Sequence, residues 1–95
     1  MKQHYIITYD LRSQDMDYTR LVASIKSYSS WVHPLERVWC IYTDKDAGII
    51  YDELKVYINP SADRLLIMRM PDLDKVAIQG WLGSNFWTWL TNTNI

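Results

Sequence analysis

Four short runs rich in β-branched and aromatic residues alternate with two amphipathic segments, and this order constrains the fold more than any other feature of the sequence. The predicted strands and helices cover, in chain order, residues 4–10, 18–28, 31–35, 38–42, 46–57 and 64–69. Pro34, inside the second predicted strand, indicates a bulge or the edge of a sheet. The order strand–helix–strand–strand–helix–strand is that of the ferredoxin-like split βαβ arrangement. The sequence therefore predicts an α+β fold with four strands in one sheet and two helices on one face.

The chain length allows a single hydrophobic core, because 95 residues leave no room for a second one. We predict one domain over residues 1–95, with a βαββαβ core at 1–70 and a tryptophan-rich C-terminal extension at 71–95. The sheet face that the two helices leave open must also be covered. The candidates for covering it are the C-terminal extension and a partner chain.

Each predicted helix has an aspartate where the first turn needs a hydrogen-bond acceptor, Asp17 in the first and Asp46 in the second. The spacing of apolar residues then marks a buried face on each helix. The residues expected on these faces are Leu21, Val22, Ile25 and Tyr28 in the first helix, and Ile49, Ile50, Leu54 and Tyr57 or Ile58 in the second.

The C-terminal end is aromatic and carries no charge. The chain holds five tryptophans, and no charged residue follows Lys75. Residues 83–90 have the pattern of a short capped helix. A neutral, tryptophan-rich end is not expected to be a solvated tail, so we predict that Trp81, Phe86 and Trp89 are buried and form an interface. Packing, rather than a ligand site, is the expected role of the tryptophans.

Charge and cysteine content exclude several classes of protein. The net charge of −1 does not support a highly basic nucleic-acid binder, although a local patch stays open. Cys40 is the single cysteine, so an intramolecular disulfide is excluded, and we expect a buried core residue in a cytoplasmic protein. His4 and His33 lie far apart in sequence, and a catalytic triad with Cys40 is not expected. Residues 1–10 lack the pattern of a signal peptide, and no apolar run approaches the roughly 20 residues that span a bilayer.

Short motifs in a fixed order extend over nearly the whole chain. They are Tyr-Ile-Ile-Thr-Tyr-Asp-Leu at 5–11, Trp-Val-His-Pro-Leu-Glu at 31–36, Val-Trp-Cys-Ile at 38–41, Asp-Arg-Leu-Leu-Ile at 63–67, Gly-Trp-Leu at 80–82 and Phe-Trp-Thr-Trp-Leu at 86–90. In this order the chain resembles the CRISPR-associated Cas-two family of small dimeric proteins. The tryptophan-rich end is most similar to the SinR-like relatives of that family.

The resemblance implies a homodimer of ferredoxin-like domains whose sheets pack face to face. In the Cas-two family, the aspartate that ends the first strand lies at the two-fold axis and has been assigned a divalent metal in a nuclease reaction. That position matches Asp10, which the resemblance makes the candidate catalytic and Mg²⁺-binding residue of an endonuclease acting on RNA or DNA. Other members have no nuclease chemistry and act as dimeric scaffolds that hold DNA for a partner integrase.

Two interpretations of Asp10 follow from its residue type. A two-fold axis would bring two carboxylates together, as Mg²⁺ prefers more than one anionic ligand. Alternatively, Asp10 ends a strand and caps the following turn. Asp15 and Asp17 could add ligands, or they serve the start of the next helix. Because no second carboxylate adjoins Asp10, we favour a non-catalytic binding or scaffold module for a protein partner or nucleic acid, with the metal-dependent nuclease as the alternative.

Basic residues in and around the first helix and the predicted hairpin are candidates for contacts to phosphate. We take Arg12, Arg20 and Arg37 as the nucleic-acid-binding candidates, with Lys26 and Lys45 nearby and Tyr or Trp rings available for base stacking. The alternative is a solvated surface on which these charges are balanced by acidic residues.

Overall fold

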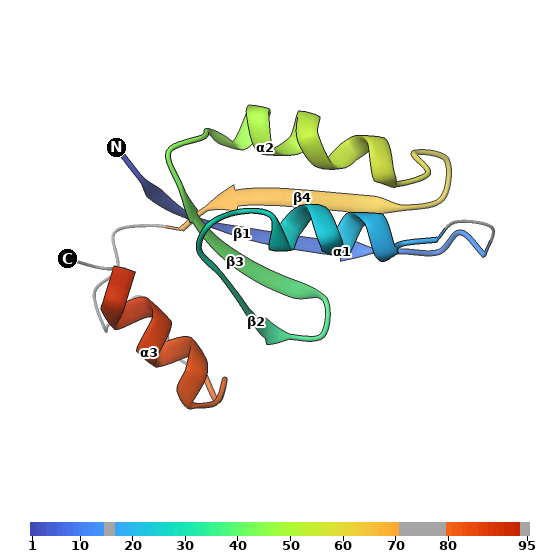
Figure 1. Cartoon of the computed structure of the whole chain (residues 1–95). Coiled ribbons are helices and arrows are strands. Elements are labelled where there is room, and N and C mark those ends of the chain that lie inside the picture. The colour runs from blue at the N-terminus through green and yellow to red at the C-terminus, as the bar shows by residue number, and fades with distance from the viewer. Residues whose placement is uncertain (15–16, 71–79, 94–95) are drawn as a thin grey trace.

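An antiparallel sheet of four strands, with two helices against one face, forms the body of the protein (Figure 1). The computed structural model describes residues 1–14, 17–70 and 80–93. The elements are β1 (Gln3–Asp10), α1 (Thr19–Lys26), β2 (Trp31–Leu35), β3 (Val38–Thr43), α2 (Ala47–Leu54), the short 3-10 helix η1 (Lys55–Tyr57), β4 (Arg64–Arg69) and α3 (Ser84–Thr93). The predicted α+β class is confirmed.

β1 lies inside the sheet, whose strand order is β2-β3-β1-β4. It pairs antiparallel with β3 on one side and with β4 on the other, so Ile7 lies between Trp39 and Ile67. Both faces of β1 are in contact with other side chains, which explains why the neighbouring residues Ile6 and Ile7 are both apolar.

β2 forms one edge of the sheet. Its register with β3 shifts between Val32 and Leu35, on either side of Pro34. Proline has no backbone N–H to donate to a neighbouring strand, so it is found at edges and bulges. The prediction for Pro34 is confirmed.

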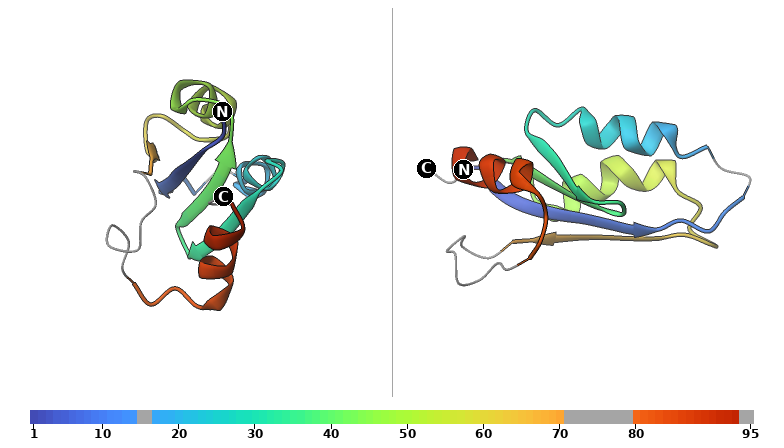
Figure 2. Two further views of the ribbon diagram at one scale, coloured as in Figure 1. Left: turned by 90° about the vertical axis from the view of Figure 1, so that its left-hand side faces the viewer. Right: turned by 90° about the horizontal axis from the view of Figure 1, so that it is seen from below.

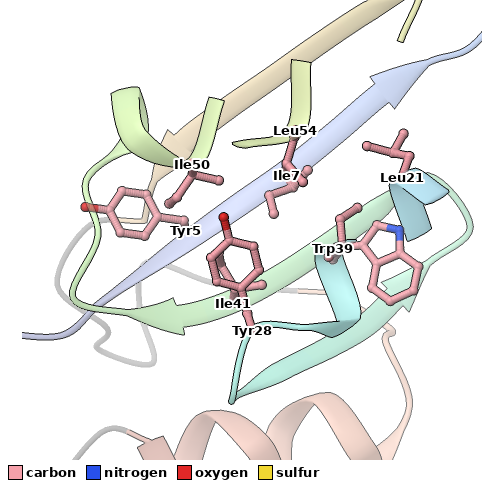
Figure 3. Close-up of a cluster of buried hydrophobic side chains, with 9 residues drawn as sticks. Tyr5, Ile7, Leu21, Tyr28, Trp39, Ile41, Ile50 and Leu54 are labelled. Atoms are coloured by element: carbon pink, nitrogen blue, oxygen red, sulfur yellow. The ribbon is translucent and has the colours of Figure 1, made fainter. Parts of the chain in front are cut away.

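Helices α1 and α2 cover one face of the sheet, called here the first face, and enclose the main core (Figure 3). The buried residues of this core are Tyr5, Ile7, Leu21, Ile25, Tyr28, Trp39, Ile41, Ile50 and Leu54. Burying one such aliphatic side chain stabilises the fold by about 1.5–3 kcal/mol. The predicted helix faces are confirmed except at Ile49, which is 47 % exposed. Ile49 lies about 100° around the helix axis from the buried Ile50, so it is turned away from the sheet.

Of the two aspartates predicted to cap the helices, Asp46 does so, whereas the N-cap of α1 is Tyr18, which makes no side-chain cap hydrogen bond. Asp17 Oδ1 accepts a hydrogen bond from the Thr19 N–H at 2.9 Å. Asp46 is the N-cap of α2, and its Oδ1 accepts from the Ile49 N–H at 2.9 Å. The second helix is shorter than expected, because α2 ends at Leu54 and the chain tightens into η1 for one further turn.

Helix α3 packs against the second face of the sheet, at the end that holds the N-terminus (Figure 2). Cys40 alternates along β3 with the core residues Trp39 and Ile41, so its side chain lies on this second face. Phe86 is buried against Cys40 and Met70. The predicted burial of Phe86 is confirmed, and α3 covers only one end of the second face.

Hydrogen bonds among the described residues hold α3 to β1 and to the segment just before β2. Trp89 is half-buried, and its Nε1 donates to Ser30 Oγ at 2.9 Å. His4 Nε2 lies 2.8 Å from Thr93 Oγ1, and its buried ring packs against Trp89 with 5.4 Å between ring centroids. Trp89 is therefore partly rather than fully buried within the chain, and an interface with a partner at this residue stays a prediction.

The predicted burial of Trp81 is wrong for the single chain, because its side chain is 99 % exposed. Trp81 precedes Gly83, whose φ of +79° turns the chain into α3. It therefore lies outside the helical face that packs on the sheet. A contact between Trp81 and a partner stays a prediction, and residues 71–79 of the predicted extension lie outside the described residues.

Candidate functional site

Asp10 ends β1 on the second face, at the opposite end of the sheet from α3 (Figure 1). Its side chain is 38 % exposed. Oδ2 accepts a hydrogen bond from Arg12 Nε at 2.9 Å and forms an ion pair with Arg12 Nη2 at 2.7 Å. This hydrogen bond and the charge of Asp10 raise the pKa of the Arg12 guanidinium. The candidate metal ligand is therefore already paired within its own chain.

Arg37 approaches the same carboxylate from the turn between β2 and β3. Its Nη1 lies 3.7 Å from Asp10 Oδ1. Thr8 Oγ1 donates a hydrogen bond to the Arg37 carbonyl at 2.9 Å, which fixes the turn beside β1. The structure thus places Arg12 and Arg37, two of the predicted phosphate contacts, beside Asp10, the predicted metal ligand.

A third arginine completes the group. Arg64 begins β4 directly opposite Asp10 in the β1–β4 register. Both residues line an open hollow of about 400 Å³, together with Thr8 and Leu66. We call Arg12, Arg37 and Arg64 around Asp10 the arginine cluster.

Asp63 lies next to the arginine cluster and is buried. Its carboxylate accepts hydrogen bonds from the Arg12 N–H at 2.8 Å, the Ser13 N–H at 3.1 Å, the Asn59 N–H at 2.8 Å and the Tyr18 hydroxyl at 2.7 Å. Burial alone would raise the pKa of Asp63, but these hydrogen bonds outweigh it and hold the pKa to about 2. The ionised Asp63 therefore fastens the loop that carries Arg12.

Within one chain, the surroundings of Asp10 do not fit a divalent cation. Both Arg12 contacts, the hydrogen bond and the ion pair, are to Asp10 Oδ2, and the neighbouring guanidinium groups would repel a cation. Over residues 1–14, 17–70 and 80–93, no three His, Cys, Asp or Glu side chains form a group that could hold a metal ion. Mg²⁺ would require Arg12 to release Asp10 and a second copy to supply another carboxylate.

The other predicted ligands and phosphate contacts near α1 lie elsewhere. Arg20 lines a separate hollow with Asp17 and Tyr57. The hydrogen bonds from Thr19 hold the pKa of Asp17 below its usual value, as expected for a helix-starting carboxylate. Asp15 lies outside the described residues.

Neither candidate lysine joins the arginine cluster. Lys45 Nζ lies 2.7 Å from Glu53 Oε2, and the Tyr28 hydroxyl donates to the same carboxylate. These two partners hold the pKa of Glu53 below its usual value. Lys26 Nζ instead lies over the ring of Trp31, 5.5 Å from its centroid.

The histidines and Cys40 have separate environments. Burial raises the pKa of the Cys40 thiol to about 12, so it stays protonated at neutral pH. The prediction that Cys40 is a buried core residue is confirmed. His4 contacts α3, whereas His33 stacks on Trp39 with 3.7 Å between ring centroids.

Apolar side chains are exposed on the second face between α3 and the arginine cluster. Leu66 and Met68 of β4 are 55 % and 51 % exposed, and Leu35 at the end of β2 is also exposed. Leu66 and Met68 pair with Thr8 and Ile6 of β1, which places them on the second face. We call Leu35, Leu66 and Met68 the open strip.

Sequence reasoning missed Arg64 and the role of Asp63. Both lie in a motif that the resemblance singled out, but nothing local identifies their partners. The pairing of Arg64 with Asp10 depends on the register of two strands that are more than fifty residues apart in sequence. The four donors around Asp63 come from two loops that only the folded chain brings together.

Comparisons with protein-family models, with curated proteins and with solved structures found no match to this chain. The resemblance to the Cas-two family therefore rests on the sequence motifs alone. None of the helices in the described ranges has the length and apolar character needed to cross a membrane.

Proposed function

We propose that this protein is a small Cas-two-like module that binds nucleic acid as a homodimer and carries out no catalytic step. The arginine cluster supports this proposal most directly. The guanidinium groups of Arg12 and Arg37 lie within 4 Å of one partly exposed carboxylate, and Arg64 lines the same hollow, so positive charge is in excess here even when the buried Asp63 is counted. Guanidinium groups suit the geometry and charge of phosphate oxygens.

We also propose that the fold is ferredoxin-like and that the protein is a homodimer. The strand order β2-β3-β1-β4, with α1 and α2 on the first face, supports a ferredoxin-like assignment. The open strip leaves apolar side chains in water beside the arginine cluster. A second copy packed on this strip would remove them from water and would double the number of arginines along one surface.

Salt-dependent binding to a labelled oligonucleotide tests the proposal. We expect replacement of both Arg12 and Arg37 by Gln to weaken binding. It should also lower the slope of log affinity against log salt by about 0.7 to 0.9 for each phosphate that the variant no longer neutralises. Arg20→Gln is the control, since it removes one charge from a separate surface and should leave the slope unchanged. An equal effect of Arg20→Gln per charge removed, or affinity that does not change with salt, would contradict the assignment. If the protein binds no oligonucleotide at low salt, nucleic acid is not its ligand, and a protein partner becomes the proposed occupant of this surface.

A metal-dependent endonuclease is the alternative, and one observation favours it. Asp10 is partly exposed at the end of β1 on the same face as the open strip, where a second copy would bring its own Asp10 near. In that case the pure protein should cut RNA or DNA in Mg²⁺ or Mn²⁺, and Asp10→Asn should abolish the cut without changing the fold. Absence of any metal-dependent cut would leave the non-catalytic module as the function.

A further inference from the structure

We propose that the outer face of the His33 ring, with Trp31 beside it, is a stacking site for an unpaired nucleobase. This inference rests on the proposed nucleic-acid binding and names the part of the ligand that would be recognised. The ligand class is single-stranded RNA or DNA, because a base within a duplex has no free face to offer. The arginine cluster would hold phosphates, and His33 would hold a base.

His33 is fixed as an outward-facing platform. Its ring lies nearly parallel to that of Trp39, with 3.7 Å between centroids and 6° between planes. Its Nε2 donates a hydrogen bond to the Glu36 carbonyl at 2.9 Å. The residue is nevertheless exposed, and Trp39 covers one face of the ring, so the opposite face is the one available to a ligand. A base stacked there would extend an existing pair of rings without ordering a mobile side chain.

The surroundings of His33 have the composition of a single-strand site. Trp31, two residues earlier on β2, is 38 % exposed, and its ring centroid lies 5.5 Å from that of Trp39. Lys26 places its ammonium 5.5 Å from the Trp31 centroid and 5.9 Å from the Trp39 centroid. Exposed aromatic rings next to a cation combine base stacking with attraction for the sugar-phosphate backbone.

The platform is joined to the arginine cluster through one turn of chain. His33 bonds to the carbonyl of Glu36, and the next residue is Arg37, whose guanidinium lies near Asp10. β2 is the edge strand, and within the described residues no strand lies beyond it. A nucleic-acid strand whose phosphates meet Arg37 can therefore continue past this edge and place a base on His33.

The test compares three labelled ligands of equal length: an oligothymidylate or oligouridylate, the same backbone with abasic sites, and a duplex. We expect the wild-type protein to bind the unpaired strand more tightly than the abasic strand. His33→Ala should weaken binding to the unpaired strand about tenfold, with no change in the salt slope. His33→Phe, which keeps a ring for stacking, should retain most of the affinity. Tyr51→Ala is the control, because Tyr51 is an exposed aromatic residue on α2, outside the platform.

The outcomes separate this inference from the proposed function. If His33→Ala binds as well as wild type while the Arg12 and Arg37 double variant is weakened, the stacking site is wrong and the phosphate contacts stand. Equal affinity of the wild-type protein for the unpaired strand and the abasic strand would likewise show that the stacking site is wrong. If the wild-type protein binds none of the three ligands, both are contradicted. A circular dichroism melt of each variant shows whether its fold is retained.

Discussion

Asp63 is the residue on which the geometry of the arginine cluster most depends. It accepts hydrogen bonds from the backbone of Arg12 and Ser13 after β1, from the backbone of Asn59 before β4, and from the Tyr18 hydroxyl. The Arg12 backbone is thereby held where its guanidinium reaches Asp10. The buried carboxylate of Asp63 is thus a positioning group for Arg12.

We expect Asp63→Ala to lower the free energy of unfolding by about 2–4 kcal/mol, because it leaves several donors without their acceptor. Urea unfolding at pH 7 measures this change. Asp52→Ala is the control, since Asp52 makes only a surface ion pair with Lys55 and its loss should cost less than about 0.5 kcal/mol. A similar cost for the two variants would show that Asp63 does not fasten the loops.

Because the pKa of Asp63 is lowered in the folded protein, the stabilisation that Asp63 provides should be lost in acid. The folded-state pKa of about 2 lies below the ordinary value of 3.8, so the stabilisation is complete above pH 3.8 and is lost as the pH falls through 2. The difference in stability between wild type and Asp63→Ala should stay constant from pH 7 to 5 and shrink between about pH 4 and 2. Urea unfolding at stepped pH checks it, and a difference that changes near neutral pH would contradict the assignment.

At the scale of elements, the sequence predicted those strands and helices whose apolar residues recur at regular spacing. Leu21 and Ile25 in α1, and Ile50 and Leu54 in α2, lie on the sheet as their spacing indicated. The helix α3 could be predicted, but its contacts could not, because Phe86 packs on residues from distant strands.

The errors and omissions at this scale have the same cause. The apolar spacing predicted burial of Ile49, and the neutral, tryptophan-rich end predicted burial of Trp81, but each lies outside the face that its segment presents to the sheet. Asp10, Arg12 and Arg37 could be proposed from sequence, whereas Arg64 required the pairing of β1 with β4. Tertiary pairing, rather than residue type, therefore decided which candidates came together.

The docking of α3 should depend on Phe86. We expect Phe86→Ala to weaken this docking by about 3 kcal/mol, because a buried ring is replaced by a cavity. Cys40 lies beneath Phe86, so its reaction with a thiol reagent should become faster in this variant. Trp81→Ala should leave the labelling rate unchanged. An unchanged rate in Phe86→Ala would show that α3 does not cover Cys40.

His4 should make the attachment of α3 sensitive to acid. Burial lowers the pKa of His4 below its ordinary value of 6.5, so the folded protein favours the neutral ring. The stabilisation is complete above pH 6.5 and is lost as the pH falls below it. The melting temperature of the wild type should therefore drop between pH 7.5 and 5 more than that of His4→Gln, which can still donate to Thr93. Equal drops would show that protonation of His4 does not affect stability.

At the scale of the whole molecule, the second face is divided between two kinds of surface. α3 covers one end, and the open strip and the arginine cluster occupy the rest. If a second copy covers the open strip, sedimentation at micromolar concentration should give about twice the chain mass of 11.3 kDa. Leu66→Lys should shift the protein to the single-chain mass. Ile49→Lys, which alters an exposed isoleucine on the first-face helix α2, should not. A wild-type monomer would contradict the dimer.

The most direct test of the proposed function is the affinity of Asp10→Asn for an oligonucleotide, measured with EDTA and again with Mg²⁺. Asn keeps the shape of Asp10 but removes the charge that pairs with Arg12 and Arg37, which frees both guanidinium groups for phosphate. We expect Asp10→Asn to bind at least as tightly as the wild-type protein. Mg²⁺ should not strengthen the binding of either protein, and neither should cut the ligand. Weaker binding by Asp10→Asn, or a Mg²⁺-dependent cut that this substitution abolishes, would contradict the non-catalytic module.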